Sequence, residues 1–266
     1  MPTENRTLAF QNKVAVITGA SSGIGRATAL ALAAGGACLG LGARNLPALE
    51  QLASQIEELG CQALAVKADV THSAQVEILI QKTIERWGRV DILVANAGQY
   101  IRAPISRMKV ADLERSMAVN FYGSVYPVLK VLPHMIQRRS GHIVFVNSMN
   151  ARKGIPPDAP YVSAKSALSG FSEVLRQELY GSGVYVSAIY PGRVDTPMIA
   201  HLRVPWLSAK ISPEAVAKAI VRAIQRKQEE VILPPQAKML HLLNVFSPRL
   251  ADWVVRSFHL EGWEER

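Results

Sequence analysis

The sequence has little cysteine and no long apolar run. Its two cysteines, Cys38 and Cys61, lie in or beside predicted strands without CxxC or Cys/His spacing, so we expect free buried thiols and no metal site. No apolar stretch reaches the 18 or so residues that cross a bilayer. Residues 1–13 also lack the apolar region of a signal peptide. These absences favour a cytoplasmic protein.

Acidic residues are outnumbered by basic ones, 21 Asp and Glu against 30 Lys and Arg, which gives a net charge of +9. The basic residues are scattered and no nucleic-acid-binding motif accompanies them, so we expect no nucleic-acid partner. A basic surface can instead help to attract an anionic cofactor. With 266 residues and a 49% apolar composition, the chain suits one large α/β domain.

Apolar, β-branched runs alternate with segments of helical periodicity. This alternation predicts a Rossmann-type fold, a doubly wound, mostly parallel sheet between two layers of helices, with ligands at the carboxyl ends of the strands. The predicted strands are residues 13–18, 37–42, 62–66, 91–94, 141–147, 184–190 and 230–233. The predicted helices are residues 26–34, 47–59, 73–87, about 108–139, a helix that begins at Asp158, and about 212–228.

A glycine-rich turn joins the first predicted strand to the first predicted helix. Gly19, Gly23 and Gly25 have the spacing Gly-x-x-x-Gly-x-Gly, which differs from the commoner dinucleotide fingerprint. Glycines let the backbone approach a pyrophosphate, whose charge is held by free amides at the helix N-terminus. The turn therefore predicts a dinucleotide site, and a plain β–α turn is the alternative.

Arg44 follows the second predicted strand, at the tip where the adenosine ribose of a dinucleotide would lie. An acidic residue there would bind the ribose 2′-hydroxyl, whereas an arginine accommodates a 2′-phosphate. Arg44 thus favours NADP(H) over NAD(H), against the alternative of a solvated loop arginine. Asp69 and Val70 follow the third strand, where the adenine edge would lie. For Asp69 the alternative is a cap of the next helix.

Two further sites with small or polar residues follow the third predicted strand, at residues 96–98 and at Asn120. Asn96, Ala97 and Gly98 follow the fourth predicted strand, where they either let a ligand pack against the backbone or form a tight turn. Asn120 lies among apolar residues and needs a partner, because an unsatisfied buried amide costs about 1–3 kcal/mol. A satisfied core asparagine is the alternative reading.

Tyr161 and Lys165 are four residues apart on a predicted helix, so their side chains share one face. A free tyrosine has a pKa of about 10 and must shift by about 3 units to exchange a proton near neutrality. A positive charge about 4 Å away supplies about 4 kcal/mol, which is enough. Tyr126 and Lys130 have the same spacing, but we expect Pro127 to disturb that helical face.

Together these residues resemble the short-chain dehydrogenase/reductase family, from about residue 13 to residue 233. Ser148 precedes Tyr161 by the family's usual interval, whereas Leu113 stands at that interval before Tyr126. The matching positions are residues 18–25, Asp69, residues 96–98, Asn120, Ser148, Tyr161, Lys165, Pro191, Gly192 and Thr196.

The resemblance implies a catalytic tetrad. Tyr161 would be the general acid in carbonyl reduction or the base in alcohol oxidation, and Ser148 would polarise the carbonyl oxygen. Lys165 would lower the pKa of Tyr161 and hold the nicotinamide ribose, while Asn120 would position a water for proton relay. The implied cofactor residues are Gly19, Ser21, Ser22, Gly23, Ile24, Gly25, Arg44, Asp69, Val70, Asn96, Ala97, Gly98, Tyr161, Lys165, Pro191, Gly192, Val194 and Thr196.

Ser22 stands where many NADP-preferring relatives have a basic residue, so the preference for NADP(H) rests on Arg44 alone. The expected substrate is a hydrophobic secondary alcohol or ketone, such as a steroid, lipid or aromatic ketone, because the candidate walls are mostly apolar. These walls are Gln99, Tyr100, Ile155, Pro156, Met198, His201 and Trp206, beside Ser148 and Tyr161. The rival function is a catalytically silent protein of the same fold that senses NADP(H).

Residues 236–266 extend beyond the domain predicted for residues 1–235 and are too few for a second domain. Apolar residues at near-helical spacing from Lys238 to Phe258, broken by Pro248, predict two short amphipathic helices. We expect them to pack on the parent domain or on a partner subunit of a homodimer or homotetramer. The alternative is peripheral contact with a membrane through Lys238, Arg249 and Arg256.

Overall fold

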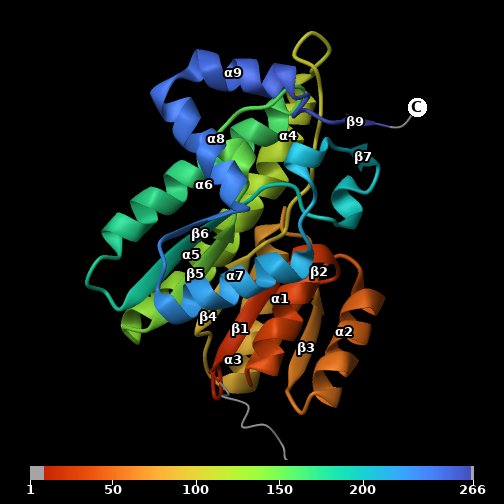
Figure 1. Ribbon diagram of the computed structural model, residues 1–266. Helices are drawn as coiled ribbons and strands as arrows, with labels where there is room; N and C mark the ends of the chain where they lie inside the picture. Colours follow the sequence, from red (N-terminus) through yellow and green to blue (C-terminus); the bar gives the residue numbers. More distant parts are fainter. Residues whose placement is uncertain (1–8, 265–266) are drawn as a thin grey trace, which may run out of the picture.

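The computed structural model describes residues 9–264. Seven strands form one sheet in the order β3-β2-β1-β4-β5-β6-β8, and every neighbouring pair is parallel (Figure 1). The strands are β1 (Val14–Thr18), β2 (Cys38–Ala43), β3 (Ala63–Lys67), β4 (Ile92–Ala95), β5 (Gly141–Val146), β6 (Val184–Pro191) and β8 (Glu230–Leu233). The prediction of a doubly wound parallel sheet is confirmed.

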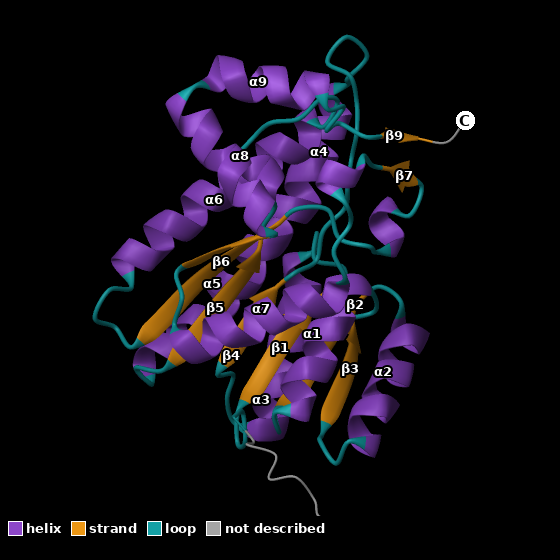
Figure 2. Ribbon diagram, in the orientation of Figure 1, coloured by secondary structure: helices purple, strands orange, loops and turns teal. Residues whose placement is uncertain are grey.

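Helices cover both faces of the sheet (Figure 2). Buried side chains of α1, α2 and α7 pack on one face, and those of α3, α5 and α6 pack on the other. The helices are α1 (Gly23–Ala34), α2 (Leu46–Glu58), α3 (Ser73–Trp87), α4 (Val110–Ser116), α5 (Gly123–Gln137), α6 (Ala159–Glu178), α7 (Pro213–Arg226), α8 (Pro235–Phe246) and α9 (Pro248–Ser257).

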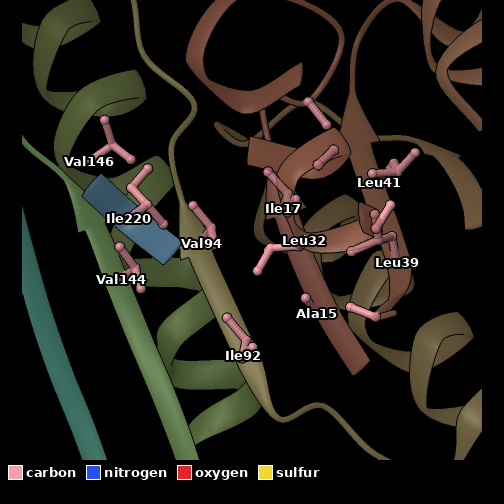
Figure 3. Packing of buried hydrophobic residues seen from close by; sticks show 14 of the residues in the cluster. Ala15, Ile17, Leu32, Leu39, Leu41, Ile92, Val94, Val144, Val146 and Ile220 are labelled. Carbon is pink, nitrogen blue, oxygen red and sulfur yellow. The ribbon is translucent and has the colours of Figure 1, made fainter. Parts of the chain in front are cut away.

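Alternate residues of each central strand enter opposite halves of the core. Ile17 and Val94 pack with Ile220 of α7 (Figure 3), whereas Val16 and Leu93 join the cluster on the other face. Because both faces are covered, β1 reads as a continuous apolar run in which all five residues are buried. This burial explains why the strands were recognisable in the sequence.

The helix predicted for residues 108–139 is divided into three parts. A π-helical segment, Met117–Tyr122, separates α4 from α5, and α5 then continues through Pro127. Pro127 therefore does not end α5, and the irregular turn lies immediately before that helix. Lys130 pairs with Glu77 at 2.8 Å, and Tyr126 stacks on Tyr122. Tyr126 and Lys130 thus each contact a residue other than one another, Tyr122 and Glu77 respectively.

Two short segments near the sheet's carboxyl edge are linked by a small antiparallel ladder. It joins β7 (Leu202–Arg203) to β9 (Trp263–Glu264), so the segment between β6 and α7 contacts the end of the described chain. Cys38 and Cys61 are free and only partly buried. Within residues 9–264, no helix is long and apolar enough to span a membrane.

His142 on β5 gives the fold a specific sensitivity to acid. Its side chain is 5% exposed, its Nε2 lies 2.8 Å from Ser187 Oγ, and burial with the nearby Lys227 lowers its pKa to about 4. Between pH 6.5, the ordinary histidine value, and about pH 4, the unfolded chain binds a proton that the folded chain does not. The free energy of unfolding therefore falls as the pH drops, by roughly 3 kcal/mol in all.

We expect His142→Gln to remove most of this loss. Urea unfolding of both proteins at about pH 7.5 and about pH 4.5 gives the free energy of unfolding at each pH. The change in that free energy between the two pH values is then compared, so any cost of the substitution that is the same at both pH values cancels. A variant that loses as much stability on acidification as the original protein would contradict the assignment to His142.

Candidate active site

A cavity of about 840 Å³ lies at the carboxyl ends of the central strands. Most of the residues predicted for the cofactor and substrate sites line it. They are Gly19, Ser21, Ser22, Gly23, Ile24, Arg44, Asp69, Val70, Asn96, Ala97, Gly98, Gln99, Tyr100, Ser148, Ile155, Tyr161, Lys165, Pro191, Gly192, Val194, Thr196 and Met198. The parallel sheet thus gathers strand ends that are far apart in the sequence.

Five predicted site residues lie outside the cavity wall. Gly25 and Asn120 lie just behind it and are described below. Pro156, His201 and Trp206 are exposed, Trp206 to 83%, so the prediction that these three form the substrate wall is corrected. They belong to loops and a short 3₁₀ turn whose side chains face outward. The sequence pattern does not reveal that orientation.

The glycine turn is closely packed against β4 and the segment after β6. Gly19 has φ +65°, and a Cβ there would lie 2.8 Å from the Cα of Ala97. Gly23 has φ +53°, and its Cβ would lie 2.9 Å from Thr196. Asn96 fastens the turn, because its Nδ2 donates to the carbonyls of Thr18 and Gly19 at 2.9 and 3.2 Å.

Helix α1 begins at this turn with no side chain capping its first amides. Ser22 is the N-cap residue, and its side chain makes no cap hydrogen bond. Amides at a helix N-terminus that no side chain satisfies form a ready site for an anion. The turn therefore lines the cavity and offers the hydrogen-bond donors that a pyrophosphate requires.

Arg44 and Asp69 stand at the ends of neighbouring strands. Arg44 is exposed directly after β2. Burial acts to raise the pKa of Asp69, but hydrogen bonds from Thr71 and the nearby Arg44 charge outweigh it and hold that pKa below its ordinary value. Asp69 accepts from the amide and hydroxyl of Thr71 at 2.9 and 2.8 Å, while His72 is the N-cap of α3. Asp69 therefore forms a turn and does not cap the helix.

Ser148, Tyr161 and Lys165 meet at the cavity wall. The Ser148 side chain lies close enough to Tyr161 to act on its pKa, and Lys165 Nζ lies 5.9 Å from the centre of the Tyr161 ring. Lys165 Nζ also donates to the carbonyl of Val146 at 2.9 Å. The first two turns of α6 and the segment just after β5 thus place two hydroxyls and an amine together at the cavity wall.

Burial shifts the pKa values of Tyr161 and Lys165, and the Tyr161 pKa moves opposite to the predicted direction. Burial raises the pKa of Tyr161 to about 12, despite the opposing effect of Ser148, and it lowers the pKa of Lys165 to about 8. The prediction that Lys165 lowers the Tyr161 pKa is therefore corrected for the protein alone. The amine is directed to the Val146 carbonyl, and desolvation disfavours charge on both groups.

Asn120 is fully buried in the π-helical segment and is satisfied, as its surroundings required. Its Oδ1 accepts from the amide of Gln99 at 3.0 Å, and its Nδ2 donates to the Gln99 carbonyl at 2.9 Å. A Cβ on Gly98 would lie 2.9 Å from Asn120 Oδ1 and 3.9 Å from Lys165 Nζ. Asn120 therefore lies behind Gly98, on the same side of the site as the amine.

A buried polar cluster beside Tyr161 was not identified from the sequence. Asp158 is 1% exposed and accepts hydrogen bonds from Tyr100 Oη, from Arg102 Nε at 3.1 Å and from Asn150 Nδ2 at 2.8 Å. The Tyr100 ring meets the Tyr161 ring edge-on, with centroids 5.0 Å apart. The cluster thus holds the Tyr100 ring in contact with the Tyr161 ring. The sequence indicated Asp158 only as a helix start.

The C-terminal extension supplies part of the cavity wall. Two helices are found where two were predicted, and Met239, Leu240, Leu243 and Val254 of these helices line the cavity together with Leu260. The segment after Ser148 holds them, because Lys153 forms an ion pair with Asp252 and donates to Asn244 at 3.0 Å. The apolar spacing was visible in the sequence, but its position beside the site was not.

Comparison with known proteins gives a consistent result. A family model described as short chain dehydrogenase matches residues 13–205. The "Fatty acyl-CoA reductase" of Acinetobacter baylyi is 37% identical over 83% of this chain and 76% of its own length. An alcohol dehydrogenase from Thermococcus sibiricus, solved with 5-hydroxy-NADP, has 32% identity, a TM-score of 0.76 and coverage of 83% of this chain and 95% of its own. A Burkholderia phymatum short chain dehydrogenase/reductase, solved with NAD, has 26% identity, a TM-score of 0.84 and coverage of 91% and 96%.

Proposed function

Because the chain belongs to the short-chain dehydrogenase/reductase family, we propose that it is an NADP(H)-dependent oxidoreductase that interconverts a secondary alcohol and a ketone. The observation that carries this proposal is that Ser148, Tyr161 and Lys165 line one large cavity, with Lys165 one helical turn from Tyr161. Family membership supports an oxidoreductase acting on CH–OH or C=O groups. The choice of cofactor and substrate is inferred from this chain's own residues.

The residues present fit a nicotinamide dinucleotide. Gly19 and Gly23 let the turn pack closely against Ala97 and Thr196 while it lines the cavity, and the uncapped start of α1 offers amides to the pyrophosphate. Asp69 and Val70 would border the adenine, while Pro191, Gly192, Val194 and Thr196 would border the nicotinamide. When bound, this cofactor supplies or accepts the hydride.

The two hydroxyls divide the work on the carbonyl oxygen. Ser148 would donate a hydrogen bond that polarises the carbonyl, and Tyr161 would deliver the proton as the oxygen gains negative charge. A pKa of about 12 keeps Tyr161 protonated at neutral pH, which suits its role as proton donor in the reduction direction. The edge-on contact with Tyr100 would hold the phenol in place for that transfer.

Lys165 and Asn120 would return the proton to Tyr161. With a pKa of about 8, Lys165 can both release and take up a proton near neutral pH. Asn120 holds the Gln99 backbone through two hydrogen bonds and lies with Lys165 beside Gly98, so it would position a relay water through that backbone. Lys165 would in addition bind the ribose hydroxyls of the cofactor.

The cavity favours a hydrophobic substrate. Gln99, Ile155 and Met198 remain candidate walls, and the chain adds an apolar set that the sequence did not place there: Ile199, Leu202, Met239, Leu240, Leu243, Val254 and Leu260. The name of the Acinetobacter relative, a fatty acyl-CoA reductase, is consistent with a lipid-like substrate. NADPH consumption with a panel of long-chain, steroid and aromatic ketones tests the proposal. NADPH binding without consumption on any ketone would favour a silent cofactor sensor.

Arg44→Asp tests the choice of cofactor. A 2′-phosphate near Arg44 would meet repulsion from the new carboxylate, whereas the 2′-hydroxyl of NADH would gain an acceptor. We expect the Kd for NADPH to rise about tenfold or more and the Kd for NADH to stay constant or fall. Titration of each cofactor by calorimetry measures both values. Arg222→Asp, an exposed charge reversal on α7, is the matched control, and an equal loss of both cofactors in Arg44→Asp would remove the basis for NADP(H).

A further inference from the structure

Helices α8 and α9 leave most of their large apolar side chains in solvent. No residue of α8 is buried, and α9 buries only Ala251 and Val255. Phe246 is 84% exposed, Val245 62% and Trp253 55%. We call this set the C-terminal face: Met239, Leu242, Val245, Phe246, Leu250 and Trp253. Figure 1 shows the two helices together at the end of the molecule toward which the strands of the sheet point.

The charges around the C-terminal face are mainly positive. Lys238, Arg249 and Arg256 are exposed on the same two helices. The one acidic residue of α8 and α9 is Asp252, and the buried Lys153 pairs with it. The face therefore combines apolar side chains with exposed cations and little opposing charge. That combination is typical of a helix that lies in the interfacial plane of an anionic membrane.

The cavity reaches this face. Met239 lines the cavity and is also 71% exposed, so it stands where the cavity meets the surface. Leu240 and Leu243, on the same helix, continue the apolar lining inward. A route of apolar side chains thus connects the C-terminal face to the space beside Tyr161.

We propose that the C-terminal face docks on an anionic lipid bilayer and that this contact sets the apolar mouth of the cavity against the lipid. The delivery of a hydrophobic substrate by this route rests on the proposed function, whereas docking itself does not. A second copy of the chain is the less favourable occupant, because two such faces would bring like charges together. Lipid headgroups of negative charge would neutralise them instead.

Sedimentation of the full-length protein with lipid vesicles tests the docking. We expect binding to phosphatidylcholine vesicles that contain about 30% phosphatidylglycerol to be about tenfold stronger than binding to phosphatidylcholine alone, and to weaken with salt. The double variant Val245→Ser/Phe246→Ser removes apolar groups that do not line the cavity, and Arg249→Glu/Arg256→Glu reverses two charges. Each should bind the anionic vesicles about tenfold or more weakly.

Two controls match these changes elsewhere on the surface. Tyr180→Ser alters an apolar residue that is 94% exposed at the end of α6, and Arg222→Glu reverses an exposed charge on α7; both should bind vesicles as the original protein does. Absence of vesicle binding, or equal binding by the original protein and both C-terminal variants, would overturn the proposal. So would a change from dimer to monomer in Val245→Ser/Phe246→Ser without lipid binding, which would assign the face to a second copy.

Reduction of a small water-soluble ketone in the same preparations separates docking from catalysis. We expect the C-terminal variants to retain it, because none of their altered residues lines the cavity. If no ketone is reduced while vesicle binding follows the expected pattern, the proposed reaction fails and the docking surface stands.

Discussion

Replacing Tyr161 with phenylalanine is expected to lower the rate of ketone reduction about 10³-fold or more, while the affinity for NADPH changes by less than about threefold. The substitution removes one oxygen, the proton donor, and keeps the ring that meets Tyr100 edge-on. Loss of a positioned general acid costs about 10²–10⁴-fold. Steady-state kinetics with NADPH and the best ketone of the panel measure the rate, and calorimetry measures the affinity.

Tyr126→Phe is the matched control for this experiment. Tyr126 has the same four-residue spacing to a lysine, but Lys130 pairs with Glu77 and neither residue of that pair lines the cavity. We expect Tyr126→Phe to reduce ketones at nearly the original rate. If Tyr161→Phe kept its activity within about tenfold, the proton would have to come from another group and the role assigned to Tyr161 would be wrong.

The raised pKa of Tyr161 favours carbonyl reduction over alcohol oxidation at neutral pH. Reduction needs the protonated phenol, which is the dominant form at neutral pH when the pKa is about 12. Oxidation of an alcohol needs the phenolate, which then forms in only a small fraction of molecules. The rate of oxidation should therefore rise with pH over a range in which reduction is nearly constant.

The fold was predictable because its signals are local. A strand such as β1, buried on both faces, appears in the sequence as an apolar run, and the glycine turn after it marks the change to a helix. The shared face of Tyr161 and Lys165 followed from helical spacing, whereas Ser148 was placed beside them by the resemblance to a known family. Each of these inferences depended on residues within one or two elements.

The parts that were missed depend on contacts between distant residues. Asp158 receives hydrogen bonds from Tyr100 and Arg102, and Lys153 holds Asp252 from 99 residues away, so no periodicity reveals them. The shift of the Tyr161 pKa was misjudged for a related reason. Spacing predicts that a lysine is near, but desolvation depends on everything that surrounds the pair.

Gly25→Ala is expected to raise the Kd for NADPH about 100-fold and to lower the free energy of unfolding by about 1–3 kcal/mol. A Cβ at this position would lie 2.3 Å from the carbonyl oxygen of Gly19 and 2.6 Å from Nδ2 of Asn96. Both neighbours belong to the turn that would cradle the pyrophosphate, so α1 must move away from it or the turn must open. Either movement separates the helix amides from the position that the cofactor requires.

Gly170→Ala separates this steric effect from helix propensity. Gly170 lies within α6, where nothing stands within 4 Å of an added Cβ, so alanine there should stabilise the protein by up to about 1 kcal/mol. Gly25 is also helical and without a positive φ, so backbone preference alone predicts the same gain. If close packing decides, urea unfolding should show a lower free energy of unfolding for Gly25→Ala and a higher one for Gly170→Ala. NADPH titration of the same two variants should show weaker binding for Gly25→Ala. Stabilisation by Gly25→Ala with unchanged NADPH affinity would show that the turn tolerates the Cβ and that its glycines do not set the cofactor site.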